Sequence, residues 1–261
     1  MPLSRCTTTF ALLAAIALAA TGTPARAASL EEGLAKFKDQ AILHMDSALA
    51  GAERMKAAVA AKDVEGAKRA WIESHAGWEW SETFTGEEYA ELDEAIDAWP
   101  DPKAGYHAFE AKLFAGQLVD IGEPLDGLVD KLREFTKQLR AKGVTTQGLL
   151  NGTAKLAYET GEKKSGGGES AASGTSLDDM RNNIAGVDTA YTMVFGPVLA
   201  SRGPKFDDLA RSLLARMKTL LQAPDLKTLD QVEFGKVAER FAINLQNAAP
   251  RVGLTAPSLE D

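Results

Sequence analysis

Apolar side chains recur along most of this chain at the spacing of an α-helix. One such stripe, with steps of four, three and four residues, consists of Leu128, Leu132, Phe135 and Leu139. Similar stripes occur at 209–220 and 237–248. This period is typical of helices that bury one face, and alternating runs of β-branched residues, which indicate strands, are rare. The pattern therefore predicts an all-α protein with roughly eight or nine helices.

Glycine, serine and proline residues divide the helical pattern into two halves. The segment 161–175 is rich in Gly and Ser, which is typical of a flexible loop, and a helix is expected to start at Ser176. We expect an N-terminal bundle of residues 28–142 and a C-terminal bundle of residues 143–261. Two up-and-down bundles lying side by side, with a cleft between them for a ligand, are the simplest arrangement.

The first 27 residues have the features of a cleavable signal peptide. Arg5 gives a positive start, an apolar run follows from Phe10 to Ala20, and Ala25-Arg26-Ala27 is typical of a cleavage site. The apolar run is too short to cross a membrane as a helix. We expect an exported protein in the periplasm or on the cell surface, with no transmembrane segment in its mature chain.

The formal net charge of −8 limits the class of ligand. An acidic protein is repelled by the phosphates of nucleic acids and by anionic membrane surfaces, whereas it attracts cations. The single cysteine, Cys6, lies in the predicted signal peptide, so the mature protein would have neither a disulfide nor a thiol nucleophile. We therefore expect a cation, and no nucleic acid, as a partner.

The most informative motif is the run from Gly105 to Glu110, which places His107 three residues before Glu110. Positions three apart on a helix lie on one face, so one imidazole and one carboxylate can bind the same metal ion. Glu79 and Glu82 have the same spacing on a segment rich in tryptophan. Buried carboxylates need a cation or a proton, and helix-borne Glu and His ligands are one way in which bundles bind metals.

Each of these pairs also has an explanation without a metal. A partly buried histidine can be satisfied by a neighbouring glutamate, and two acids on a helix are usually solvated. Asp93 or Asp97 could add an oxygen ligand, although both also fit an exposed acidic helix. His75 lies on the same helical face as Glu79, but we expect it to be a core histidine, and His44 to be structural. The candidate metal ligands are His107, Glu110, Glu79, Glu82 and Asp93.

Together these segments resemble the imelysin-like peptidase family, and in particular its EfeO type, the periplasmic components of iron uptake. The Gly-x-His-x-x-Glu run at 105–110 is the family signature, and the segment 78–82 resembles the aromatic-Glu-x-x-Glu segment of the EfeO type. Similar segments follow at 92–97, 158–162 and 176–188, so the resemblance spans most of the predicted mature chain.

The resemblance implies a double helical bundle, a partner such as a membrane iron permease, and a metal site. By residue match, that site would be formed by His107, Glu110, Glu79 and Glu82, with Asp93 as a further ligand. Two differences from the EfeO pattern are evident. We expect a protein without the N-terminal cupredoxin-like domain of full-length EfeO proteins, and the Gly/Ser-rich segment keeps the Ser-x-Asp part of the pattern at 173–179 without the histidine.

Three functions are compatible with these features. We favour the binding of a divalent metal ion (Fe, Zn or Mn), because carboxylate and imidazole ligands suit these metals. The alternative is binding of an acidic polysaccharide such as alginate in the cleft, which the resemblance implies for related cell-surface proteins. A zinc metallopeptidase ranks lowest, because the sequence lacks both a His-Glu-x-x-His motif and a Gly-x-Ser-x-Gly elbow, and no general base is evident. Enzymatic activity is left open and is not our expectation.

Overall fold

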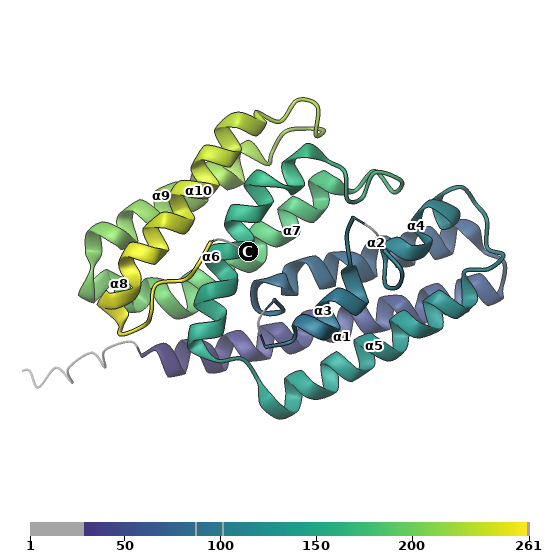
Figure 1. The fold of residues 1–261 in the computed structure, drawn as a ribbon, viewed down its shortest axis with the longest axis horizontal. Coiled ribbons are helices and arrows are strands. Elements are labelled where there is room, and N and C mark those ends of the chain that lie inside the picture. Colours follow the sequence, from purple (N-terminus) through teal and green to yellow (C-terminus); the bar gives the residue numbers. More distant parts are fainter. Residues whose placement is uncertain (1–28, 87, 101, 260–261) are drawn as a thin grey trace, which may run out of the picture.

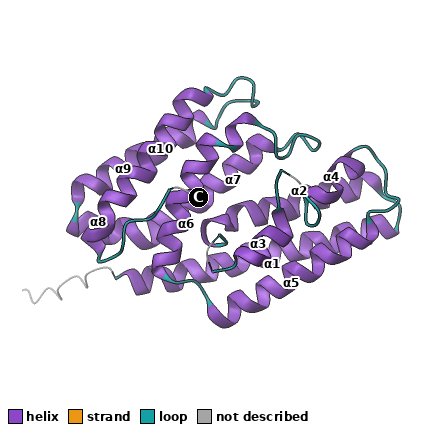
Figure 2. Ribbon diagram, in the orientation of Figure 1, coloured by secondary structure: helices purple, strands orange, loops and turns teal. Residues whose placement is uncertain are grey.

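The computed structural model describes residues 29–86, 88–100 and 102–259, so the predicted signal peptide lies outside the described residues. Within these ranges every regular element is helical (Figure 2), which confirms the all-α prediction. The first half contains α1 (Leu30–Ala60), α2 (Val64–Ser81), α3 (Ala90–Asp97), α4 (His107–Phe114) and α5 (Gly122–Lys142). The second half contains α6 (Thr146–Glu162), α7 (Ser176–Ala190), α8 (Gly196–Arg202), α9 (Pro204–Leu220) and α10 (Gln231–Ala248).

The helices form two groups that lie side by side (Figure 1). In one group α1 runs alongside α2 and α5, with the short α3 and α4 packed against them, and α6 to α10 form the other. The groups meet where α2 packs against α7, and where the short helix η1 (Glu82–Phe84) packs against α6. The candidate site lies close to this junction. The division of the chain into two independent bundles at residue 143 stays a prediction.

Side-chain caps determine where four of these helices begin. A Ser, Thr or Asp oxygen accepts a hydrogen bond from a first-turn N–H group that has no partner within the helix. The capping residues are Ser29 for α1, Asp63 for α2, Thr145 for α6 and Asp230 for α10.

Two glycines allow the second group to approach the end of α2. Gly186 of α7 lies against the carbonyl oxygen of Trp80, and Gly152 of α6 lies against the carbonyl oxygen of Thr83. A Cβ atom at either position would collide with that oxygen. The missing side chains therefore bring α6 and α7 close to the segment that carries Glu79 and Glu82.

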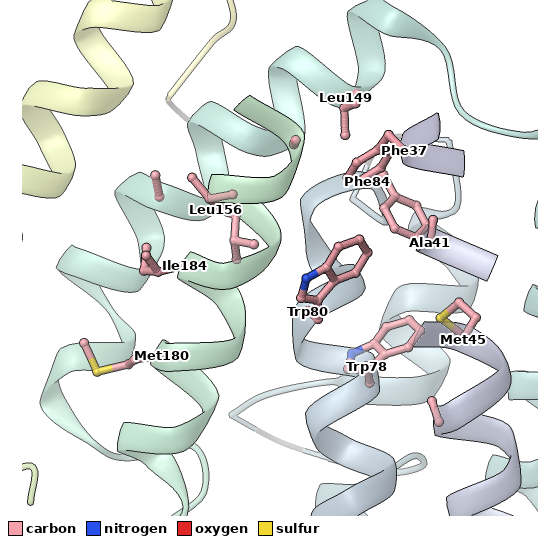
Figure 3. Packing of buried hydrophobic residues seen from close by; sticks show 14 of the residues in the cluster. Phe37, Ala41, Met45, Trp78, Trp80, Phe84, Leu149, Leu156, Met180 and Ile184 are labelled. Atoms are coloured by element: carbon pink, nitrogen blue, oxygen red, sulfur yellow. The ribbon is translucent and has the colours of Figure 1, made fainter. Parts of the chain in front are cut away.

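The apolar core continues across the junction between the two groups. Figure 3 shows two tryptophans of α2 between apolar side chains of α1 and apolar side chains of α6 and α7. The residues concerned are buried, and they include Phe37, Met45, Trp78, Trp80, Leu156, Met180 and Ile184. Close packing on both sides fixes the position of α2, so the polar side chains that α2 carries are held in a rigid frame.

One helix is longer than the sequence pattern suggests. α7, a π-helical segment (Tyr191–Phe195) and α8 form a continuous helix from Ser176 to Arg202, which begins where we expected. By length and composition alone this helix could cross a membrane, contrary to our expectation that no later segment would. However, 56% of its apolar window is buried inside the protein, so packing in the core explains its apolar character.

Candidate metal centre

Six titratable side chains from four helices converge near the junction. Residues four apart lie on one face of a helix, which brings His75 and Glu79 together on α2. The end of α3, the start of α4 and the first turn of α7 supply the other members. We call this set the imidazole–carboxylate cluster, and it consists of His75, Glu79, Asp97, His107, Glu110 and Asp179.

Asp97 lies between the two imidazoles of the cluster. Its Oδ1 atom is 3.3 Å from Nε2 of His75 and 3.2 Å from Nε2 of His107. All three side chains are almost completely buried, at 1–2% exposure. Burial alone would raise the pKa of Asp97, but the two imidazoles outweigh this effect and hold it below its usual value. Asp97 is therefore a carboxylate shared by two histidines.

The backbone before α4 holds His107 in this position. Gly105 has φ of +79°, a conformation that glycine adopts readily and other residues do not. A Cβ atom at Gly105 would collide with the carbonyl oxygen of Ile96, and the N–H of the next residue, Tyr106, donates to that same oxygen at 2.8 Å. The Tyr106 hydroxyl is 2.6 Å from Oγ of Ser74 on α2. The glycine of the motif thus ties the start of α4 to the end of α3.

Glu110 pairs with His107, as the spacing predicts. Its Oε2 atom is 2.8 Å from Nδ1 of His107, and its Oε1 atom accepts a hydrogen bond from the N–H of Ser173 at 2.7 Å. Burial alone would lower the pKa of His107, but the nearby carboxylate of Asp97 and the hydrogen bond with Glu110 raise it to about 9. Both oxygens of Glu110 are thus used, and Nε2 of His107 faces Asp97 on the opposite side of the ring.

His75 has a similar arrangement, which the sequence did not reveal. Its ring is buried beside Trp71, as expected of a core histidine, with ring centres 4.5 Å apart. However, its Nδ1 lies 3.4 Å from Oδ1 of Asp179, and its Nε2 lies 3.2 Å from Oε1 of Glu79 as well as close to Asp97. Burial lowers the pKa of His75, but the three carboxylates outweigh that effect and raise it well above its usual value.

The carboxylates of Glu79 and Glu82 both contact the ammonium group of Lys164. Nζ of Lys164, in the short helix η2 (Lys164–Gly166), is 2.9 Å from Oε2 of Glu79 and 2.7 Å from Oε2 of Glu82. Asn183 of α7 donates to the same two oxygens, at 2.7 Å each. Burial raises the pKa of Glu79 to about 7 and that of Glu82 well above its usual value, with Lys164 acting in the opposite direction.

Asp93 lies apart from the histidines. Together with Glu82 and Lys164 it lines a cavity of about 300 Å³, and burial beside Glu82 raises its pKa to about 7. Among the described residues, three groups of side chains could hold a metal ion, and Asp93 belongs to none of them. These groups are His75, Asp97 and His107, then His75, Glu79 and Asp179, and then Glu79, Glu82 and Asp97.

Several buried polar atoms of these groups lack a hydrogen-bond partner. They are Nδ1 of His75, Oε1 of Glu79, Oδ2 of Asp97 and Nε2 of His107. Unsatisfied buried polar atoms cost free energy, and a bound cation would reduce that cost for the two carboxylate oxygens and for Nε2 of His107. Nδ1 of His75 faces Asp179 at 3.4 Å instead. Oδ1 of Asp97 lies 3.2–3.3 Å from the Nε2 atoms of His75 and His107. Ligand atoms that bind one metal ion at about 2.0–2.2 Å lie roughly 3.0–3.5 Å from their neighbours around the ion, so these distances suit a shared ion. The arrangement thus fits a divalent metal ion.

Sequence reasoning left three members of this arrangement without a role. Asp97 fits an exposed acidic helix as readily as a ligand position, Asp179 lies in the first turn of the helix expected from Ser176, and Lys164 lies in the Gly/Ser-rich segment 161–175. A spacing of four does place Asp179 and Asn183 on one face of α7, but nothing in the sequence indicates that this face meets α2. His44, which we expected to be structural, stacks on Trp80 with ring centres 3.9 Å apart and takes no part in the cluster.

Residues 103–249 match the family model described as Imelysin, and the matched segment is more than half of the chain. The chain belongs to the imelysin family. It is also 29% identical, over 191 residues, to an Efem/EfeO family lipoprotein of Staphylococcus haemolyticus. That alignment covers 68% of this chain and 65% of the relative, so the chain spans about two thirds of the relative's length. The match to this relative supports the resemblance to the EfeO type that the sequence segments indicate.

A solved structure has the same fold. The crystal structure of an iron-regulated protein A precursor from Parabacteroides distasonis superposes with a TM-score of 0.70 at 16% identity. The superposition covers 89% of this chain and 97% of the other, so the two proteins share the architecture over almost the whole of the smaller one.

Proposed function

We propose that this imelysin-family protein is an exported component of iron uptake that binds a divalent metal ion at the imidazole–carboxylate cluster. The proposed ligands are Nε2 of His75, Nε2 of His107 and the carboxylate of Asp97, with Oε1 of Glu79 as a further oxygen. Glu110 and Asp179 lie behind the two imidazoles, where they would orient the rings rather than bind the ion. Compared with the set predicted from the sequence, His75 and Asp97 are added as ligands, while Glu82, Asp93 and Glu110 are no longer ligands.

The observation that carries this proposal is the matched arrangement of the two histidines. Each ring has a carboxylate at Nδ1, and each presents Nε2 to the same oxygen of Asp97 at 3.2–3.3 Å. Metal-binding histidines commonly donate their other N–H to a carboxylate, which fixes the tautomer and makes the ligand more basic. In the metal-free protein a proton on each ring would compensate the charge of Asp97, and a metal ion would displace those protons.

The type of ligand favours iron, manganese or zinc. Two imidazole nitrogens and carboxylate oxygens form a donor set of intermediate hardness, whereas Cu(I) prefers sulfur. The net charge of −8 also favours the approach of a cation. The names of the relatives, an EfeO family lipoprotein and an iron-regulated protein, support a role in iron handling in the cell envelope, with a membrane iron permease as the proposed partner.

The two other functions receive no support from the site. The cavity next to Glu82 is lined by more acidic than basic side chains, namely Glu82, Asp93, Asp97, Glu159 and Glu169 against Lys163 and Lys164. An acidic polysaccharide would be repelled there. A peptidase would need a carboxylate free to act as a base. Among the described residues, each cluster carboxylate already lies within 3.4 Å of an imidazole nitrogen.

Calorimetric titration of the mature protein with Mn²⁺, Zn²⁺ and, without oxygen, Fe²⁺ tests the proposal. We expect a Kd of about 1 μM or tighter for at least one metal, and a loss of at least about 100-fold in affinity in the double variant His75→Ala/His107→Ala. His44→Ala removes the third imidazole and should bind normally, because His44 lies outside the cluster. Absence of binding in the wild-type protein, or equal binding in the double variant, would refute the proposal.

A further inference from the structure

The ammonium group of Lys164 lies in a pocket that has the features of a cation site. Three carboxylates surround it, with Nζ 2.9 Å from Glu79, 2.7 Å from Glu82 and 3.3 Å from Glu169. The Lys164 side chain is only 12% exposed, and the three glutamates are 0%, 16% and 14% exposed. We call these four residues the Lys164 pocket. The charges in it are largely withdrawn from water, so their interaction is weakly screened.

Glu79 joins this pocket to the proposed metal site. Its Oε1 atom faces Nε2 of His75 at 3.2 Å and has no hydrogen-bond partner, while its Oε2 atom faces Nζ of Lys164 at 2.9 Å. One carboxylate thus lies between the histidines and the ammonium group. Carboxylates in this position bridge the two ions of dinuclear metal sites in helical bundles.

Without the lysine, the pocket would retain a set of oxygen ligands. The carboxylates of Glu79, Glu82 and Glu169 would remain. Asp97 lies beside them, with an oxygen within 4.8 Å of oxygens of Glu79 and Glu82. The Asp97 side chain is nearly completely buried, and its Oδ2 atom has no hydrogen-bond partner. Asn183 donates to both Glu79 and Glu82 and so holds their carboxylates in place. The adjoining cavity of about 300 Å³ is lined by Glu82, Asp97 and Glu169 and offers space for an ion to enter.

We propose that the ammonium group of Lys164 occupies a second divalent-cation site, formed by Glu79, Glu82 and Glu169, and thereby limits the protein to one metal ion. This inference rests on the proposed function, since the first ion is the one bound by the histidines. An ammonium group is a compact point charge with three donors, so it can take the place of a small cation among carboxylates. Replacing it with an apolar side chain would expose this site to metal.

The ammonium group of Lys164 also explains how the metal-free protein tolerates the buried carboxylates of Glu79 and Glu82. Glu79 and Glu82 are held close together by Asn183 and by the packing of α2, α6 and α7. Removing one partner of a buried ion pair leaves an uncompensated charge, which is strongly destabilising. Lys164 supplies a positive charge at all times, whereas a metal ion would be present only part of the time. The lysine therefore makes folding independent of metal supply.

The number of bound metal ions in Lys164→Met tests this inference. Each purified protein is saturated with Mn²⁺ or Zn²⁺, freed of excess metal, and analysed for metal per chain by mass spectrometry alongside calorimetric titration. We expect one ion per chain in the wild-type protein and two in Lys164→Met. Lys164→Arg keeps the positive charge and should bind one ion. Lys163→Met removes a charge from the neighbouring, half-exposed lysine and should also bind one.

The outcomes separate this inference from the proposed function. One ion in both the wild-type protein and Lys164→Met would overturn the inference and leave the proposed function intact. No ion in the wild-type protein would overturn the proposed function, and then a single ion in Lys164→Met would still support the second site, whereas none would overturn both. If Lys164→Met folds only when metal is present, that dependence supports the inference. If it fails to fold even with metal, while the charge-balanced variant Lys164→Met/Glu82→Gln folds, the inference is overturned.

Discussion

The imidazole rings of His75 and His107 lie 5.2 Å apart, centre to centre, and are nearly perpendicular, with an angle of 86° between their planes. One ring comes from the middle of α2 and the other from the first residue of α4, 32 residues later in the chain. Because both Nε2 atoms face Oδ1 of Asp97, the pair can direct two nitrogen lone pairs and a carboxylate at one point. Five predictions follow from the contacts that hold this pair in place.

Glu110→Gln should weaken metal binding without abolishing it. The amide has the shape of the carboxylate but not its charge, so His107 becomes less basic and less strongly oriented. Loss of such a supporting group typically costs about 10–100-fold in metal affinity. Calorimetry should show this decrease with an unchanged number of ions per chain, while the exposed Glu123→Gln should bind like the wild-type protein. Full loss of binding in Glu110→Gln would instead make Glu110 a direct ligand, as the sequence motif suggests.

Asp97→Asn should lower the pKa of His107 from about 9 towards its usual value of 6.5 in the metal-free protein. Asp97 is the principal group that favours the charged imidazole, and burial favours the neutral one. The pKa can be followed by NMR titration of the imidazole signals, with the exposed Asp130→Asn as the control. A pKa of His107 that stays near 9 in Asp97→Asn would show that Asp97 does not control this ring.

The stability of the metal-free protein should fall between about pH 5 and pH 9. The pKa of His107 is raised from 6.5 to about 9, so its favourable contribution is complete below pH 6.5 and is lost as the pH rises through 9. The pKa of Glu79 is raised from 4.5 to about 7, so its burial becomes increasingly unfavourable over that interval. Both effects therefore lower the stability of the metal-free protein as the pH rises.

The stabilisation of the protein by a bound metal ion should increase as the pH rises. Its ligands bind metal only when deprotonated, so the increase in Tm caused by Mn²⁺ or Zn²⁺ should be larger at about pH 8.5 than at about pH 5.5. Thermal unfolding followed by circular dichroism measures both trends. The variant His75→Ala/His107→Ala should lose most of the metal effect at both pH values. An increase in Tm that is independent of pH would contradict binding at the imidazoles.

Gly105→Ala should destabilise the protein and weaken metal binding together. The positive φ and the collision of a Cβ atom with the carbonyl oxygen of Ile96 each oppose alanine, and such strain costs about 1–3 kcal/mol or more. The start of α4 would shift, and with it His107. Gly127→Ala is the matched control, because Gly127 lies on the exposed face of α5 with open space around it. That substitution should stabilise the helix by about 0.5–1 kcal/mol. Equal effects of the two substitutions would contradict this account.

The helical nature of the protein and the His107–Glu110 pair follow from local sequence patterns. Apolar stripes with a period near 3.6 specify helices wherever they occur, because one face must be buried. A spacing of three brings His107 and Glu110 onto one face of a helix whatever that helix packs against. The family signature at 105–110 and the segment rich in acidic residues upstream were therefore recognisable without a structure.

Tertiary packing determined which side chains of other helices surround His75 and Glu79 in the site. His75 has the sequence features of a core histidine, and only the approach of α3, α4 and α7 surrounds it with Asp97, His107 and Asp179. Lys164 lies in a segment of low apolar content, and its contact with Glu79 and Glu82 depends on η2 lying near α7 and on the glycines that bring α6 and α7 against α2. Spacing along one helix determines which of its own residues share a face. Side-chain packing between segments far apart in the chain decides which residues of another helix lie opposite. Local periodicity contains no information about this packing.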